Sequence, residues 1–354
     1  MEGKVLYITN IDRRFSMMKK ACDILHEDNL IPSDYEVLKI DAMTVFTDVW
    51  ERKLVHSDLV IIRFMGNTIR TLFWDKCLHF LRTQKIPFYM DASGSAEGEF
   101  GDGISDDVAG LIKKYSAYGG IENYKNLWYY LASLFNPEIQ NVPLPESYCW
   151  AGIFHPDLPK TYTTDVKNYV NKYIDPQRPT IGFVFYRDEW IWGDLAYQTA
   201  FIREAEKQGV NVISVFTNGM PDASAGMPSI KEVFQKYFTC DGNTIIDTMV
   251  NVMKFSFTTS GSISVEDLKV LGVPILQAYS LIMSKKEWEE SSEGMNSMEI
   301  SISISIPEFD GIIHGLPIAY KHFTKNDEVE YLPMEERMAR MVSKAKKWLS
   351  LIRI

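Results

Sequence analysis

The length, composition and charge of the chain exclude several classes of protein. Its 354 residues exceed the usual size of one domain, so two domains with separate cores are expected. The 47 acidic and 37 basic residues give a net charge of −10, which argues against nucleic-acid binding because phosphates attract clustered Lys and Arg. No apolar run approaches the ~20 residues of a membrane span and no signal peptide is recognisable, so a cytoplasmic location is expected.

The cysteines suggest neither a zinc site nor a disulfide framework. Cys22, Cys77, Cys149 and Cys240 are far apart and form no Cys-x-x-Cys pair. We expect them to be buried thiols in a reducing compartment.

The first 140 residues alternate apolar runs with helical spacing of apolar residues. Strands are predicted at 4–9, 35–40, 57–64 and 87–90, with helices through Phe15–Leu25 and Phe73–Phe80. Such alternation indicates a mainly parallel sheet covered on both faces, so residues 1–140 are predicted to form a doubly wound α/β domain of flavodoxin-like or Rossmann-like type. Ligands are expected at the carboxyl ends of its strands.

The loops after these strands carry no nucleotide motif. Residues 9–14 contain no glycine, so they form neither a dinucleotide fingerprint nor a phosphate-cradling loop. Residues 91–103 are rich in glycine and in acidic residues, which would repel a phosphate. We interpret the second segment as a mobile surface loop.

The middle of the chain is predicted to connect two domains. A helix opens after Gly120 and is ended by Asn136–Pro137. Residues 141–178 follow with several prolines and little periodicity, and we interpret them as the crossing between the domains. His155 lies in this crossing, where an exposed histidine is more often incidental than a ligand.

A second doubly wound α/β domain is predicted for residues 179–332. Strands are expected at 180–186, 210–216 and 273–282, with a helix from Gly193–Asp194 to Gln208 and a capping box at Ser229–Glu232. The apolar residues 244–257 fit a strand or a helix equally well. Residues 333–354 are predicted to form a C-terminal helix that buries Met338, Val342, Ala345 and Leu349.

Clear local signals lie between residues 284 and 306. Ser284 and Glu287 form a capping box at the start of a short helix, and Gly294 is placed to end that helix. Residues 301–306 alternate Ser and Ile, which predicts a half-buried strand stopped by Pro307.

Two acidic residues and a histidine follow Pro307. Glu308 and Asp310 would point to the same side at the carboxyl end of the predicted strand, and His314 comes shortly after the flexible Gly311. Together they could bind a cation or move a proton. The alternative is a turn at Asp310–Gly311 beside a solvated Glu308, since acids next to glycine are common in turns.

A second candidate site follows the strand predicted at 180–186. Arg187 could bind a carboxylate with both branches of its guanidinium, and Trp190 and Trp192 could stack on a planar ligand at a helix N-terminus. Alternatively, both tryptophans pack under the helix and Arg187 pairs with a neighbouring acid. Gln277 could add hydrogen bonds from the strand 273–282, although a polar residue within an apolar strand can also bond to neighbouring backbone.

Several linked motifs resemble the large subunit of cobaltochelatase, of the CobN-like type, and the related H subunit of magnesium chelatase. The resemblance rests on Leu-Gly-Val-Pro-Ile-Leu-Gln-Ala at 271–278, Trp288, Pro-Glu-Phe-Asp-Gly at 307–311, Tyr-Gly-Gly-Ile-Glu-Asn at 118–123, and residues 179–187 with Trp190 and Gly193. These motifs span most of the chain in the right order, which makes the set more specific than any one motif.

The resemblance implies a nitrogen–metal bond-forming ligase that acts on a tetrapyrrole, a corrinoid or porphyrin precursor, with Co²⁺ or Mg²⁺ as the substrate metal. It also implies separate AAA+ ATPase subunits, so that ATP is used by the partners and not bound here. Phe309 is closer to the cobalt branch. Members of this family are several times longer than this chain, which corresponds to their N-terminal part, so the chain is not expected to be catalytically competent alone. Ile312 stands where many cobalt-type relatives carry a cation.

On this resemblance we expect Glu308 and Asp310 to be catalytic, helping to remove pyrrole N–H protons as the metal enters. Arg187, Trp190, Gln277 and His314 are expected to bind the substrate, and no metal ligand is assigned. Two other interpretations remain open from the sequence: a two-lobed module that binds a small ligand, and a structural module that docks partner subunits.

Overall fold

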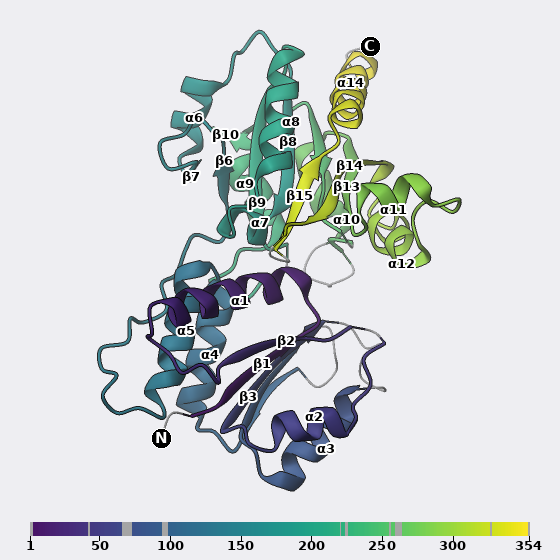
Figure 1. Ribbon diagram of the computed structural model, residues 1–354. Coiled ribbons are helices and arrows are strands. Elements are labelled where there is room, and N and C mark those ends of the chain that lie inside the picture. Colours follow the sequence, from purple (N-terminus) through teal and green to yellow (C-terminus); the bar gives the residue numbers. More distant parts are fainter. Residues whose placement is uncertain are drawn as a thin grey trace. The chain divides into compact units, whose positions relative to one another are not determined.

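The computed structural model describes residues 3–352, except 42, 66–72, 94–97, 220, 224–225, 255, 259–263 and 326–327. The chain divides into two compact units, shown in Figure 1. Unit 1 comprises Met1–Tyr148 and Lys325–Val329, and unit 2 comprises Cys149–Thr324 and Glu330–Ile354. Among the described residues, no helix is both long enough and apolar enough to cross a membrane.

Unit 1 is built on a five-stranded sheet in the order β2-β1-β3-β4-β5. The strands are β1 (Val5–Thr9), β2 (Glu36–Lys39), β3 (Leu59–Met65), β4 (Phe88–Ser93) and β5 (Glu99–Asp102). The first four are mutually parallel and β5 is antiparallel to β4, which confirms the prediction of a mainly parallel α/β sheet. β5 occupies part of the predicted surface loop 91–103, because Phe100 packs edge-on against Phe88 at 5.7 Å between ring centroids.

The helices of unit 1 cover both faces of this sheet (Figure 1). They are α1 (Asp12–Glu27), α2 (Asp48–Leu54), α3 (Asp75–Gln84), α4 (Asp106–Tyr118) and α5 (Ile121–Ser133). Alternate residues of β1 point to opposite faces of the sheet. Leu6 and Ile8 pack in the core with α2 and α3, whereas the ring centroid of Tyr7 lies 6.2 Å from that of Trp128 in α5.

Unit 2 contains an eight-stranded sheet in the order β15-β14-β13-β12-β8-β9-β6-β7. Its strands are β6 (Gly152–Phe154), β7 (Tyr162–Thr163), β8 (Thr180–Tyr186), β9 (Asn211–Thr217), β12 (Thr248–Asn251), β13 (Ile275–Leu281), β14 (Ile313–Phe323) and β15 (Val329–Pro333). The run from β9 to β14 is parallel. Across the sheet these strands are ordered β9-β8-β12-β13-β14, which is the same arrangement as β2-β1-β3-β4 in unit 1. The direction in which successive strands are added to the sheet therefore reverses between β8 and β12.

Two cores cover the faces of the second sheet. Helices α8 (Ala196–Lys207) and α14 (Glu335–Ile352) pack on one face, and α6 (Val166–Tyr173), α9 (Ile230–Tyr237) and α10 (Val265–Leu268) pack on the other. As predicted, α14 buries Met338, Val342 and Ala345, whereas the side chain of Leu349 lies outside the described residues. The ambiguous segment 244–257 contains strand β12, and the segment 141–178 contains β6, β7 and α6.

The prediction of a strand at residues 301–306 is wrong. α12 (Ser297–Ile300) continues as a π-helix (Ser301–Ser305) and then as α13 (Ile306–Glu308). The buried positions are Glu299, Ser303 and Pro307, which recur every four residues as on a helix, so burial follows the helical period and not the Ser-Ile alternation. Pro307 is compatible with this helix because it lies in the first turn of α13, where a residue can lack an N–H donor.

The capped helix before this segment is confirmed. α11 (Lys285–Glu290) begins with the predicted capping box, in which the side chains of Ser284 and Glu287 each accept a backbone N–H. It ends at Glu290, before Gly294. The same reciprocal box starts α9 at Ser229 and Glu232.

Candidate functional site

Asp310 anchors the Pro307–Gly311 turn from within the protein. It is buried, and its Oδ2 accepts the backbone N–H of Phe257 at 2.6 Å. Its Oδ1 accepts the hydroxyls of Ser256 at 2.6 Å and Thr258 at 2.5 Å, and the Thr258 N–H at 3.3 Å. Each carboxylate oxygen is therefore satisfied by protein donors, which fits a structural role for this side chain.

Glu308 and Phe309 form the exposed part of the same turn. Both side chains are exposed, Phe309 by 74%, which is unusual for a large apolar ring. The turn reverses at Gly311, whose φ of +75° favours glycine and whose N–H donates to the Glu308 carbonyl at 3.0 Å.

The expected geometry of this turn requires two corrections. Glu308 and Asp310 do not share a side, because the helical backbone turns Glu308 to solvent and Asp310 inwards. They also precede β14, which runs parallel to β13, and therefore do not lie at the carboxyl end of a strand. The backbone of His314 belongs to β14, but its side chain lies outside the described residues.

Several polar side chains bond to one segment, residues 252–254 and 256–258, which we call the β12 loop. The Tyr186 hydroxyl donates to the Lys254 carbonyl at 2.9 Å and accepts the Lys254 N–H at 3.0 Å. Asp310 holds the far end of the loop, as described above. The β12 loop follows β12 at the reversal point of the sheet, where doubly wound domains bind ligands.

Gln277 also serves the β12 loop. It is buried, and its Nε2 donates to the Met253 carbonyl at 3.0 Å while its Oε1 accepts from Asn251 Nδ2 at 2.9 Å. Both polar ends of the amide therefore bond within the protein, as the alternative interpretation of this residue required.

Arg187 and Trp190 pack against other parts of unit 2 than the Pro307–Gly311 turn. Arg187 is fully buried, and burial lowers the pKa of its guanidinium. Its Nε donates to the Cys149 carbonyl at 2.9 Å, and the guanidinium lies 4.3 Å from the centroid of the Trp150 ring. Trp190 stacks on Phe216 at 4.1 Å with an interplanar angle of 4°. One face of the Trp190 ring, which was predicted to stack on a ligand, is therefore covered by Phe216.

Glu299 is an ionisable residue of this region that the sequence patterns did not single out. It is fully buried in α12, and its Oε1 accepts the backbone N–H of Ile282, just after β13, at 2.5 Å. No described residue donates a hydrogen bond to its Oε2. Burial raises the pKa of Glu299, and the nearby charges of Lys254 and Lys321 oppose that rise. The sequence did contain a signal for a helix here, because Glu299 comes three residues after Asn296, which caps α12.

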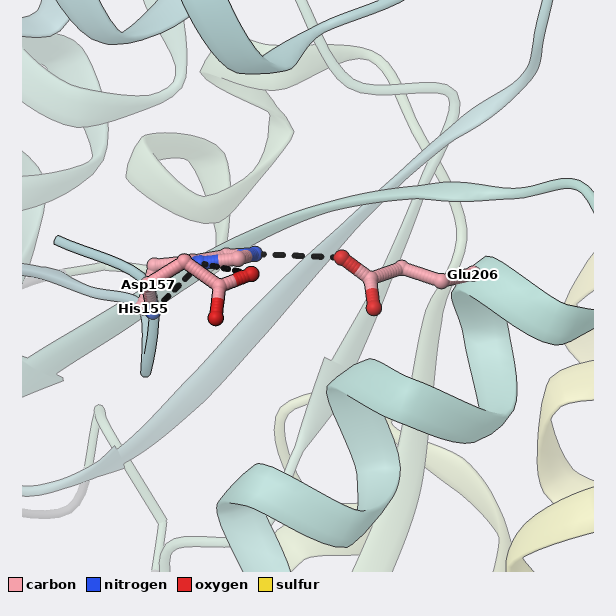
Figure 2. Close-up of side chains that lie close together, drawn as sticks. All are labelled: His155, Asp157 and Glu206. Carbon is pink, nitrogen blue, oxygen red and sulfur yellow. Dashed lines mark hydrogen bonds and ion pairs between the residues drawn. The ribbon is translucent and has the colours of Figure 1, made fainter.

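A cluster of possible metal ligands lies elsewhere in unit 2, after β6. In Figure 2 the imidazole of His155 points toward Glu206, and Asp157 lies beside His155. His155 Nε2 is 3.3 Å from Glu206 Oε1. His155 is buried, contrary to our expectation of an exposed residue, and its Nδ1 accepts the Asp157 N–H at 3.2 Å. Arg203 pairs with Asp157 at 2.5 Å and with Glu206 at 2.9 Å. Arg203 already neutralises both carboxylates and both imidazole nitrogens are engaged, so these residues fit an ion-paired cluster and not a metal site.

The fold and these motifs define a doubly wound α/β protein of the chelatase type. The family CobN/magnesium chelatase matches residues 113–354, which is more than half of the chain. The protein belongs to this family, as its motifs predicted.

Individual relatives agree with this assignment. An uncharacterised protein of Methanocaldococcus jannaschii is 29% identical over 259 residues, covering 70% of this chain and 21% of the relative. The magnesium-chelatase H subunit of Rhodobacter capsulatus is 29% identical over 224 residues, covering 60% and 18%. The aerobic cobaltochelatase subunit CobN of a Sinorhizobium species is 23% identical over 327 residues, covering 88% and 25%. The chain thus spans about a fifth to a quarter of the length of these relatives.

A solved structure shares the fold. The catalytic subunit of cobaltochelatase from Mycobacterium tuberculosis aligns with a TM-score of 0.57 at 18% identity, over 100% of this chain and 28% of that subunit. This likeness supports the α/β architecture of the present chain.

Proposed function

We propose that this chain is the tetrapyrrole-binding part of a chelatase subunit that inserts Co²⁺ or Mg²⁺ into a corrinoid or porphyrin precursor. Membership of the CobN/magnesium chelatase family supports the class of reaction. The observation that carries the proposal is the pairing of an exposed carboxylate, Glu308, with an exposed aromatic ring, Phe309, on a turn whose backbone is fixed by Asp310. A flat, apolar macrocycle that carries N–H groups matches both exposed side chains.

Each exposed residue has a distinct role in this proposal. The Phe309 ring contacts the face or edge of the macrocycle. The Glu308 carboxylate accepts a hydrogen bond from a pyrrole N–H and then the proton, while the nitrogen keeps the electron pair and bonds to the incoming metal. Two N–H protons leave for each divalent ion that enters, so one carboxylate accounts for one of them. Asp310, expected to be catalytic, is instead proposed as the residue that positions this turn.

Further parts of the proposal concern the partners. The names of relatives such as the H subunit of magnesium chelatase describe proteins that work as subunits. By analogy with these subunits, separate AAA+ ATPase partners would hydrolyse ATP and so drive insertion of the metal into the macrocycle. His314, Arg187, Trp190 and Gln277 stay proposals as substrate-binding residues, and the contacts of the last three favour structural roles within unit 2.

Absorbance titration with two porphyrins tests the proposal. Free-base deuteroporphyrin carries two central N–H groups, whereas its zinc complex carries none. We expect both to bind the wild-type chain with a shift of the Soret band. We expect Glu308→Gln to weaken free-base binding about fivefold, the effect of one charge-assisted hydrogen bond at an exposed site, and to leave the zinc complex unaffected.

The control and the opposing results are equally specific. Glu290→Gln removes another exposed carboxylate, from α11, and should change neither affinity. The absence of a spectral change with both porphyrins would refute tetrapyrrole binding by this chain. Equal loss for both porphyrins in Glu308→Gln would refute the role of Glu308 as an N–H acceptor.

A further inference from the structure

One continuous helix leads into the Pro307–Gly311 turn. α12, the π-helix Ser301–Ser305 and α13 follow one another without a break, and the residues at both junctions keep right-handed helical backbone angles. The exposed Glu308 is the last residue of this helix, and the exposed Phe309 is its C-cap. The direction of both side chains therefore depends on how the helix is rotated about its axis.

The π-helix changes that rotation. Glu299, Ser303 and Pro307 are all buried, at a spacing of four residues. In an α-helix of 3.6 residues per turn, eight residues overshoot two full turns by about 80°, so Glu299 and Pro307 would not share a face. A π-helix has more residues in each turn, because its hydrogen bonds join residues i and i+5. The π-helical segment thus keeps both positions on the buried face and leaves Glu308 and Phe309 on the solvent side.

Glu299 ties the start of this helix to the sheet. Its side chain is fully buried, and its Oε1 accepts the N–H of Ile282, the first residue after β13, at 2.5 Å. The backbone N–H of Glu299 donates to the side chain of Asn296 at 2.9 Å, which caps α12. The backbone that Glu299 binds is itself held by the pairing of β13 with β14.

A close apolar contact holds the π-helix against the same two strands. Ile304 packs in a cluster with Tyr279 and Leu281 of β13. On β14, a Cβ atom at Gly315 would lie 3.4 Å from Ile304 Cγ1 and 3.0 Å from Tyr279 Cε1. The absence of a side chain at Gly315 therefore lets the π-helix approach the strand backbone closely.

We propose that Glu299 is a positioning residue: its hydrogen bond to Ile282 sets the rotation of the helix that presents Glu308 and Phe309 to the macrocycle. This inference rests on the proposed tetrapyrrole-binding function. Asp310 holds the other end of the turn, so two buried carboxylates fix the exposed side chains from both sides. When the Glu299 contact is released, the turn takes its binding position only part of the time, and the affinity falls in proportion.

Two conservative changes of Glu299 separate its position from its charge. Glu299→Gln keeps an oxygen in place for the Ile282 N–H and loses no other hydrogen bond, since no described residue donates to Oε2. Glu299→Asp keeps the carboxylate but draws it back by one methylene, so the 2.5 Å contact is lost or the helix shifts. In a titration with free-base deuteroporphyrin, we expect Glu299→Asp to bind about fivefold more weakly than the wild type, and Glu299→Gln within about twofold of it. Glu293→Asp makes the same change at an exposed position before α12 and should bind like the wild type.

Hydrogen exchange tests the same proposal without a ligand. The N–H groups of Phe309, Asp310 and Gly311 donate to the carbonyls of residues 306–308 at 3.0–3.1 Å, so none of them bonds to Glu299. Glu299→Asp should nevertheless speed their exchange about fivefold, because the helix that leads into the turn is released. Glu299→Gln and Glu293→Asp should leave it unchanged. A merely local role of Glu299 would speed exchange at Ile282 alone.

Each outcome decides one of the two proposals. A thermal unfolding curve identifies the folded variants. Unchanged exchange at residues 309–311 in folded Glu299→Asp would overturn the positioning role, and so would wild-type porphyrin affinity in that variant. Equal losses in Glu299→Gln and Glu299→Asp would also overturn it, because charge and not position would then matter.

A second variant and the ligand-free measurement keep the test decisive. If Glu299→Asp does not fold, Glu299→Met fills the same buried space without a polar group, and the same two losses are expected of it. If the wild type binds no porphyrin, the proposed function fails by itself, and the exchange at residues 309–311 still decides whether Glu299 positions the turn.

Discussion

Replacing Asp310 tests whether this residue is the anchor of the β12 loop. In Asp310→Ala, the buried N–H of Phe257 loses its 2.6 Å acceptor, and the hydroxyls of Ser256 and Thr258 lose theirs. Each buried group left unsatisfied costs about 1–3 kcal/mol, and the hydroxyls can partly recover by rotation, so we expect a loss of about 3–4 kcal/mol of unfolding free energy for unit 2.

Asp310→Asn should cost less, for a geometric reason. Its carbonyl oxygen can face the Phe257 N–H while its NH₂ group donates to the two hydroxyls, which can reverse and accept. The Thr258 N–H then loses its longer contact, to Asp310 at 3.3 Å, but keeps Ser256 Oγ as an acceptor at 3.1 Å, so the expected loss is about 1 kcal/mol.

Hydrogen exchange followed by mass spectrometry provides the assay, because it reports on the β12 loop separately from the rest of the chain. The amides of Phe257 and Thr258 should exchange faster in the order Asp310→Ala, Asp310→Asn, wild type. Glu308→Gln, on the exposed side of the same turn, should leave their exchange unchanged. Unchanged protection in Asp310→Ala, or equal effects of Asn and Ala, would refute the anchoring role.

Three further predictions concern unit 2. Gly182→Ala should destabilise it by about 1–3 kcal/mol in urea unfolding, because a Cβ there would lie 2.8 Å from Ile246 Cδ1 and 3.0 Å from Phe238 Cε1; a neutral effect would contradict the packing of β8. Burial lowers the pKa of His155 below its usual 6.5, so the folded state binds its proton less readily than the unfolded state, and unit 2 should lose stability as the pH falls from 6.5 towards 5. His155→Gln should reduce that pH dependence; an identical pH profile would contradict it. Addition of Zn²⁺ or Co²⁺ should raise the melting temperature of the wild type no more than that of His155→Gln, and a larger rise in the wild type would show that the His155 cluster binds metal after all.

The regular elements could be predicted because their signals are local. The apolar runs that became β1, β3 and β8, and the capping boxes at Ser229 and Ser284, need only neighbouring residues to be recognised. The alternation of strands and helices then sufficed to predict parallel sheets, although the identical winding order of the two units became visible only in the structure.

The prediction failed where burial in the tertiary structure outweighs local preference. Residues 301–306 combine a strand-like alternation with a helical pattern of burial, in which Glu299 and Ser303 face the interior. That error also misplaced Glu308 and Asp310, because the direction of each side chain depends on the backbone conformation.

The candidate site shows the same limit. Arg187 and Gln277 were recognised as polar residues within apolar surroundings, but their partners, the Cys149 and Met253 carbonyls, lie 38 and 24 residues away in the chain. Glu299 was overlooked because its hydrogen-bond partner, the backbone N–H of Ile282, lies 17 residues away in the chain. No spacing in the sequence records that arrangement.

The central claim is that the exposed Phe309–Glu308 turn receives a tetrapyrrole. Its most direct test is titration of free-base deuteroporphyrin with the wild-type chain, Phe309→Ala and Leu144→Ala, since Leu144 is another highly exposed apolar residue, 76% exposed, in unit 1. The account predicts saturable binding to the wild type and to Leu144→Ala, and about tenfold weaker binding to Phe309→Ala, which corresponds to ~1.4 kcal/mol of lost apolar contact. Binding of equal strength to all three proteins, or to none, would contradict it.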